Sequence, residues 1–365
     1  MGLNVGFDVG RAVRVAGGGL AAAGALAVGA AAGAALERLV MLRTARRDSS
    51  LPAPDFPTQV REVITADGTC LHVEVDDPGG AASRLTVIFC HGYALSLDSW
   101  RYQRRDLQGK ARLVFYDQRS HGKSDRAEFD THHVDQLGSD LFDIITALAP
   151  EGPLVLVGHS MGGMTIMALA EQHPELFKRR VFGVALIATS AGGLAEVSLG
   201  LPSFVGPVLQ RLASPAAAAL ARQKAVVELS RRTTTDLGLL LTRLYAFGSV
   251  ASDEAGRFVA QMIAATPIDV LAEFLPALQD HDKRAALAIL QQCEVLVVVG
   301  DADRLTPPQH SAQIVHHIPG AEFVIVAKGG HMVFVEHHEQ VDALLEELID
   351  RVWRNITGFR EEPVA

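Results

Sequence analysis

The segment 155–164 constrains this chain most strongly, because it predicts three consecutive backbone elements. Residues 154–157 are apolar, as in a short buried strand, and residues 164–170 favour a helix. Between them, the sequence GHSMG at 158–162 fits the pattern G-x-S-x-G. A serine at such a junction stands on a sharp, strained turn, and its small neighbours let other backbone approach closely. Ser160 is therefore a candidate nucleophile.

The rest of the chain alternates buried strands with amphipathic helices, which predicts a doubly wound, mostly parallel sheet of eight strands. An Asp67-Gly68 turn joins the first two strands as a hairpin, which supplies an antiparallel edge. The expected strands cover residues 60–66, 70–75, 85–90, 112–116, 154–157, 181–188, 295–299 and 323–326. The expected helices between them cover residues 99–107, 134–148, 161–172, 308–318 and 339–355.

One interval, residues 191–292, breaks this alternation, because it contains no convincing strand. An insertion of this length between two strands of a sheet is usually functional, and we interpret it as a helical cap over the site. It divides the α/β core into residues 60–190 and 293–365. Helices are expected in the cap at residues 216–231, 235–247, 252–265, 268–278 and 282–292.

The amino-terminal segment, residues 1–47, contains a hydrophobic helix at residues 15–36 that carries no charge. Its 22 residues suit a membrane span, although it is rich in Ala and Gly. We expect a membrane anchor; the alternatives are a signal peptide cleaved from a secreted protein and a helix packed on the protein. Four arginines follow the segment and two precede it, which favours a cytoplasmic catalytic part. Residues 48–59 contain three prolines and are expected to be an extended linker.

Composition excludes several classes of function. The net charge is −9, and no basic stripe with interleaved aromatics occurs, so nucleic acid is not an expected partner. The three cysteines are widely separated, which fits neither a disulfide framework nor a zinc site. No phosphate-binding glycine loop follows a strand, and we expect neither a cofactor nor a metal.

The carboxyl ends of the predicted strands carry the remaining candidate residues, because open α/β sheets bind ligands at that edge. Tyr93 follows the strand at 85–90, and its N–H can bind an oxyanion together with the N–H of Met161. Asp303 follows the strand at 295–299, and His331 follows the last strand. A histidine can activate the Ser160 hydroxyl as a base, and a carboxylate can orient that histidine.

Alternatives to these assignments exist in the same loops. Asp301 competes with Asp303 as the acid but is expected to support the turn. A metal site formed by His331, Glu336 and the His337-His338 pair is possible in principle, but these residues lack the H-E-x-x-H spacing.

Five motifs in this order resemble the α/β-hydrolase superfamily, and most closely its esterase, lipase and haloperoxidase-like branch. The resemblance covers about residues 60–355. Its motifs are H-G at His91, D-x-R-x-x-G-x-S from Asp117, G-x-S-x-G, G-x-x-D-x-x-x-P from Gly300 to Pro307, and G-x-H ending at His331. At Ser120, where members usually have Gly, the chain departs from the pattern, and a small shift of that turn is expected.

The resemblance implies a serine hydrolase of carboxylic esters that forms an acyl-enzyme at Ser160. It supports the spacing that selects Asp303 as the acid. The cap and the hydrophobic segment suggest an apolar, lipid-like ester as the substrate. The same triad would also serve a thioesterase, an acyltransferase, a peptidase or a cofactor-free perhydrolase of the haloperoxidase kind. A hypothesis from another class is a membrane-tethered binding protein that has lost its activity.

Overall fold

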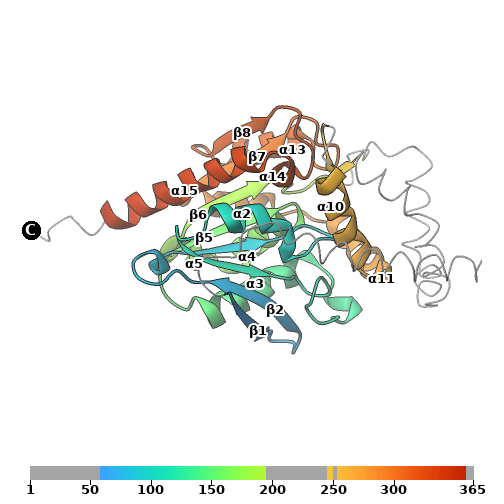
Figure 1. Ribbon diagram of the computed structural model, residues 1–365, viewed down its shortest axis with the longest axis horizontal. Helices are drawn as coiled ribbons and strands as arrows, with labels where there is room; N and C mark the ends of the chain where they lie inside the picture. Colours follow the sequence, from blue (N-terminus) through green and yellow to red (C-terminus); the bar gives the residue numbers. More distant parts are fainter. Residues whose placement is uncertain (1–57, 195–244, 250–252, 359–365) are drawn as a thin grey trace, which may run out of the picture. The chain divides into compact units, whose positions relative to one another are not determined.

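An eight-stranded sheet forms the centre of the structure, which is a computed structural model describing residues 58–194, 245–249 and 253–358 (Figure 1). The strand order is β1-β2-β4-β3-β5-β6-β7-β8. The first two strands form a hairpin, β2 pairs antiparallel with β4, and all other pairs are parallel. The predicted mostly parallel sheet is confirmed. The strands are β1 (Gln59–Ile64), β2 (Cys70–Asp76), β3 (Thr86–Cys90), β4 (Arg112–Tyr116), β5 (Leu154–His159), β6 (Val181–Ile187), β7 (Glu294–Gly300) and β8 (Glu322–Val326).

Helices cover both faces of this sheet, because successive side chains of each buried strand point to opposite sides. In β3, Val87 and Phe89 pack with α2 (Arg101–Asp106) and α15 (His338–Gly358). Ile88 and Cys90 face the other layer. That layer consists of α3 (Val134–Leu148), α4 (Met161–Gln172), α5 (Pro174–Arg179), α12 (Leu287–Leu290) and α13 (Pro308–His317).

The helices of the core agree with the sequence prediction except where they are short. Two helices, α5 and α14 (Val333–Glu336), were not predicted from the sequence, because each is too short for a clear periodicity. The helix expected at 282–292 is reduced to a 3₁₀ turn, Arg284–Ala286, followed by α12. The Asp282 carboxylate accepts the N–H of Arg284, and this hydrogen bond forms a tight turn at the start of the segment.

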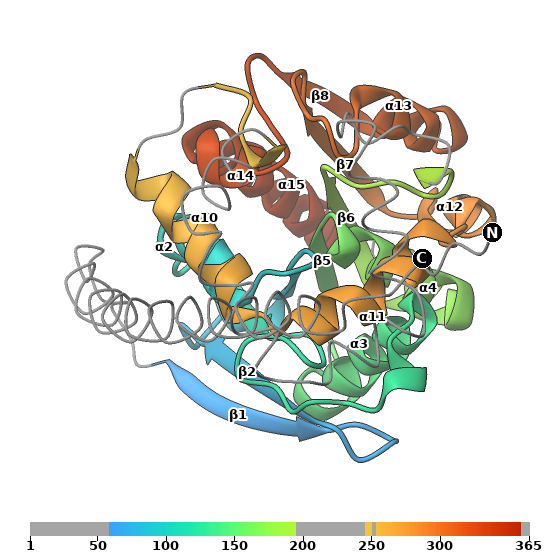
Figure 2. The ribbon, with the colours of Figure 1, turned by 90° about the vertical axis from the view of Figure 1, so that its right-hand side faces the viewer.

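The described part of residues 191–292, predicted to form a cap, contains two longer helices, α10 (Asp253–Ala265) and α11 (Ile268–Gln279), which match the predictions for 252–265 and 268–278. They lie across the carboxyl ends of the strands, in front of the sheet in Figure 2. Val270 and Phe274 of α11 pack in one cluster with Met161 and Leu137. The helices expected at 216–231 and 235–247 lie outside the described residues, apart from 245–247.

No single helix among the described residues is both long and apolar enough to cross a membrane. Only α10 and α11 taken together have the required length and composition, and they are bent by 94° relative to one another. The hydrophobic helix predicted at 15–36 lies outside the described residues.

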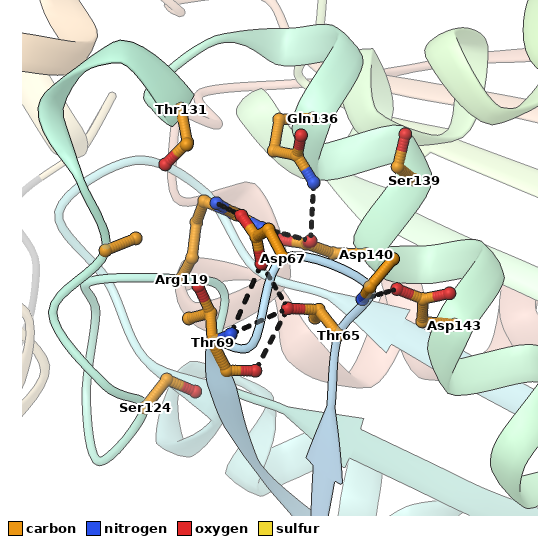
Figure 3. Close-up of polar contacts among 12 residues, drawn as sticks. Thr65, Asp67, Thr69, Arg119, Ser124, Thr131, Gln136, Ser139, Asp140 and Asp143 are labelled. Carbon is orange, nitrogen blue, oxygen red and sulfur yellow. Dashed lines mark hydrogen bonds and ion pairs between the residues drawn. The ribbon is translucent and has the colours of Figure 1, made fainter.

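A buried ion pair fastens the β1–β2 hairpin to the loop after β4 and to α3 (Figure 3). Arg119 donates two hydrogen bonds to Asp140, at 2.6 and 2.5 Å, and a third of 2.8 Å to Asp67 in the hairpin turn. The exposed fractions of the Arg119 and Asp140 side chains are 0% and 1%. Partial burial acts to raise the pKa of Asp67, but the hydrogen bonds from Arg119 and Thr65 outweigh it and hold that pKa below its usual range.

We predict that D140L lowers the free energy of unfolding by about 3–5 kcal/mol, because it leaves the Arg119 guanidinium buried without its main partner. Urea denaturation measures this change. D143L is the matched control on the same helix. Among the described residues it removes one hydrogen bond, from the N–H of Ala66 to the Asp143 carboxylate, which is worth about 1 kcal/mol. Equal losses in the two variants would contradict the importance of the buried pair.

Candidate active site

Ser160 lies between β5 and α4 with a positive φ, as a sharp turn requires. Its φ and ψ are 51° and −116°, a costly conformation for a residue with a side chain. Hydrogen bonds to the Ser160 backbone hold the turn. The Ser160 N–H donates to the carbonyl of Ile187 at 3.0 Å, and its carbonyl accepts from the Gly163 N–H at 2.9 Å and from Thr189 Oγ1 at 2.7 Å. The Ser160 side chain is thereby presented at the carboxyl edge of the sheet.

Close backbone packing explains the glycines around Ser160. A Cβ on Gly162 would lie 2.0 Å from the carbonyl oxygen of Cys90, at the end of β3. One on Gly158 would lie 2.5 Å from the carbonyl oxygen of Gly162. Gly163 is packed equally tightly, with 2.6 Å from its hypothetical Cβ to Thr189 Oγ1. The glycines therefore let α4 begin directly against the central strand, as the sequence analysis expected.

Asp303 and His331 are brought together by the loops after β7 and β8. His331 Nδ1 lies 3.0 Å from Asp303 Oδ2. The other carboxylate oxygen accepts the N–H groups of Leu305 and Thr306, at 2.9 and 3.0 Å. Both Asp303 and His331 are buried, with exposed fractions of 4% and 7%. The carboxylate is thus fixed by local backbone while it accepts a hydrogen bond from the imidazole.

Two further side chains in the loop after β7 help to identify the acid that pairs with His331. Thr306 Oγ1 donates to Asp303 Oδ2 at 2.8 Å and lies 3.2 Å from His331 Nδ1, a role that the sequence analysis missed. Asp301, the competing acid, is exposed, and its N–H donates to the carbonyl of Val326. The geometry therefore favours Asp303 over Asp301 as the partner of His331.

Tyr93 and Met161 both lie close to Ser160. A Cβ on Gly92 would lie 3.3 Å from Ser160 Cβ, so the Tyr93 loop rests against the serine. Met161 is the first residue of α4. In the part of the chain that the structure describes, neither the Tyr93 N–H nor the Met161 N–H donates a hydrogen bond. Both N–H groups are therefore available to bind an anion at Ser160. Within the described residues, no hydrogen bond joins Ser160 Oγ to His331.

The loop that carries His331 is held from several sides. Glu336 accepts the Gly330 N–H at 2.7 Å, and it also accepts the N–H groups of Gly248 and Ser249. The N–H of Met332 donates to the carbonyl of Ala246 at 2.7 Å. Glu336 therefore serves as a backbone anchor, which differs from the metal alternative considered for it.

One group with metal-ligand spacing occurs within the described ranges, far along the chain from Ser160. Asp106, His338 and Asp342 place possible ligand atoms within 4.8 Å of one another, on α2 and α15. Arg105 donates to both carboxylate oxygens of Asp106, and Gln103 donates to Asp342 at 2.5 Å. These donors occupy both oxygens of Asp106 and Oδ1 of Asp342, whereas Asp342 Oδ2 has no hydrogen-bond partner among the described residues and lies 3.5 Å from His338 Nδ1.

Two buried histidines support the Tyr93 loop. His91 Nε2 accepts the N–H of Gln118 at 2.9 Å, and His121 Nε2 accepts the N–H of Ala94 at 3.3 Å. Burial is the main cause that lowers the pKa of His91 to about 3 and that of His121 to about 4. Both rings are therefore neutral at neutral pH, as an accepting Nε2 requires.

We predict that acid weakens the fold through these histidines. The folded pKa of His121 lies below its unfolded value, so the unfolded chain binds more protons and stability falls as pH drops from about 6.5 to about 4. H121Q should reduce the slope of unfolding free energy against pH in this window by up to about 1.4 kcal/mol per pH unit. The measurement is urea denaturation at several pH values.

The exposed His316 provides the control for this experiment, because H316Q changes a histidine outside the buried loop. That variant should retain the wild-type slope. A slope in H121Q equal to that of the wild type would contradict the assignment of a buried, neutral His121.

Comparison with known proteins places this fold in a family. A family model described as the alpha/beta hydrolase fold matches residues 86–338 of the 365. The chain therefore belongs to the α/β-hydrolase fold family, and the resemblance noted in the sequence is confirmed.

Individual relatives and structures agree with this family. The chain is 24% identical over 293 residues to 3-oxoadipate enol-lactonase 2 of Acinetobacter baylyi, covering 80% of this chain and 97% of that protein. It is 28% identical over 263 residues to the dihydrolipoyllysine-residue acetyltransferase component of the acetoin cleaving system of Pseudomonas putida, covering 72% of this chain and 63% of that protein. The chain thus spans less than two thirds of that relative.

Among solved structures, the esterase RhEst1 from Rhodococcus sp. ECU1013 superposes with a TM-score of 0.64 at 20% identity, covering 80% of this chain and 99% of that chain. At this identity the likeness shows the fold alone.

Proposed function

We propose that the protein is a serine hydrolase of carboxylic esters, with Ser160 as nucleophile, His331 as base and Asp303 as the orienting acid. The observation that carries this proposal is the hydrogen bond between His331 Nδ1 and Asp303 Oδ2, at the same sheet edge as the strained Ser160. A carboxylate bound to Nδ1–H leaves Nε2 free to accept a proton. This division of roles needs all three side chains and no cofactor.

In the proposed reaction, Ser160 Oγ forms a bond to the ester carbonyl carbon while its proton passes to His331 Nε2. The N–H groups of Tyr93 and Met161 donate to the resulting oxyanion, each contributing about 3 kcal/mol. The C–O bond of the ester then breaks, and the leaving alcohol takes the proton from His331. Water, deprotonated by the same imidazole, hydrolyses the acyl-enzyme and restores Ser160.

An apolar acyl group is the proposed substrate feature, because the side chains beside the two oxyanion donors are apolar. Tyr93 packs against the cluster that contains Met161, Leu137 and two α11 residues, Val270 and Phe274. The Tyr93 hydroxyl donates to the carbonyl of Leu271, which ties this loop to α11. A panel of p-nitrophenyl esters of graded chain length tests this preference; a rate independent of chain length would oppose it.

We predict that a fluorophosphonate labels the protein at Ser160 and abolishes ester hydrolysis. The activated hydroxyl displaces fluoride from phosphorus, and the adduct mimics the tetrahedral intermediate. Mass spectrometry of proteolytic peptides locates the adduct. S160A should show neither labelling nor turnover, whereas labelling that persists in S160A would place the nucleophile elsewhere.

We predict that D303N reduces kcat by about 10⁴-fold, because an amide no longer selects the Nδ1–H tautomer of His331 or stabilises its imidazolium. D301N is the matched control, two residues away on the exposed side of the same loop. It should keep kcat near the wild-type value. Steady-state kinetics of both variants decide between the two carboxylates, and a larger loss in D301N would reverse the assignment.

We also propose that residues 15–36 tether the enzyme to a membrane, on the basis of their length and lack of charge. The full chain should then sediment with membranes, and a chain lacking residues 1–47 should stay in the supernatant with its esterase activity. The mass of the mature protein separates the two main alternatives, since cleavage within this segment would indicate a signal peptide. Equal partitioning of both chains would exclude the tether.

A further inference from the structure

His159, the residue before Ser160, forms a buried bridge to the loop that carries His331. Its Nε2 lies 3.0 Å from the carbonyl oxygen of His331. The ring contacts the rings of His331 and Phe334, with centroids 4.8 and 4.6 Å away. Only 1% of His159 is exposed. The side chain therefore touches the proposed base directly while its backbone belongs to the turn of the proposed nucleophile.

The surroundings of His159 specify how its ring is protonated. Burial, followed by the nearby His331, lowers its pKa well below the usual value, so the ring is neutral. A carbonyl oxygen can only accept, so the proton of the neutral ring must reside on Nε2. The bare Nδ1 has no hydrogen-bond partner among the described residues and faces Gly92, where a Cβ would lie 2.6 Å away.

The hydrogen bond from His159 to His331 links loops that follow two non-adjacent strands of the sheet. Ser160 follows β5, His331 follows β8, and two strands separate β5 from β8 in the sheet. Other hydrogen bonds to this loop are made by the residues next to His331. Glu336 accepts the N–H of Gly330, and the carbonyl of Ala246 accepts the N–H of Met332. Only the His159 bond fixes the carbonyl of His331 itself to the nucleophile turn, as judged from the described residues.

We propose that His159 is a positioning residue, which sets the imidazole of His331 against Ser160 through its Nε2–H···O=C bond. This inference rests on the function proposed above and adds a part to it. No direct hydrogen bond joins Ser160 Oγ to His331 across the described ranges, so the relative placement of the two side chains depends on backbone anchors. A small displacement of a reacting group lowers the rate steeply, while ground-state binding is little affected.

The test compares two variants of His159 in p-nitrophenyl ester hydrolysis. H159F keeps an aromatic ring against Phe334 but removes the donor, and it should lower kcat by about 10- to 100-fold with KM nearly unchanged. H159Q retains an amide donor in place of Nε2–H and should recover most of the lost kcat. H173F is the matched control, because His173 also stacks on a phenylalanine, Phe142, but at the far end of α4.

A measurement on the wild-type protein keeps the proposal falsifiable if a variant fails to fold. Selective ¹⁵N labelling of histidine followed by NMR should show His159 as a neutral Nε2–H tautomer with a slowly exchanging proton. An Nδ1–H tautomer would overturn the proposal. So would wild-type kcat in H159F, or a loss in H159F that H159Q does not reverse.

The two levels of the hypothesis fail in different ways. If the wild-type protein takes up no fluorophosphonate at Ser160, the proposed function fails and the inference falls with it. If Ser160 is labelled but H159F keeps wild-type kcat, only the positioning role of His159 is lost.

Discussion

The contact between the start of α4 and the end of β3 is the constraint on which the site depends. The backbone of Gly162 meets the carbonyl of Cys90 so closely that no side chain fits between them. This contact, with the positive φ of Ser160, fixes the serine at the centre of the sheet edge and brings the Gly92 loop against it. Strain of this kind persists only where packing on all sides enforces it. Here the fully buried strands β3 and β5 provide that packing.

Hydrogen bonds between loops then place the other groups around this fixed point. His91 and His121 tie the Tyr93 loop to the turn after β4, and the buried Arg119 ties that turn to the β1–β2 hairpin. On the other side, His159 reaches the carbonyl of His331. The links made by His91, His121 and His159 are buried, so they are electrostatically strong and costly to break, whereas the bond from Arg119 to Asp67 is partly exposed. The edge of the sheet therefore acts as a preorganised polar frame beneath an apolar cover formed in part by α11.

Local sequence predicted the sheet well because its strands are continuous apolar runs with clear boundaries. Every predicted strand agrees with the structure within about two residues. The motif spacing also selected Asp303, which the structure places beside His331. The positive φ of Ser120, 63°, explains why glycine is usual at that position.

What the sequence did not predict depends on contacts between distant segments. Thr306 lies against His331 Nδ1, Glu336 accepts the N–H groups of Gly248 and Ser249, and His159 binds the carbonyl of His331. No periodicity marks such residues in advance. The short helices α5 and α14 are likewise formed by packing and carry too few residues for a pattern. Side chains of α11 pack with Met161 and Leu137, and the proposed preference for an apolar acyl group rests on this cluster.

The most direct test of this account is a crystal structure of the protein after reaction with an alkyl phosphonate. We expect phosphorus bonded to Ser160 Oγ, with the phosphonyl oxygen about 2.7–3.1 Å from the N–H groups of Tyr93 and Met161. His331, held by Asp303, should face the leaving-group oxygen. An adduct on another residue, or a phosphonyl oxygen that points away from both N–H groups, would contradict the account.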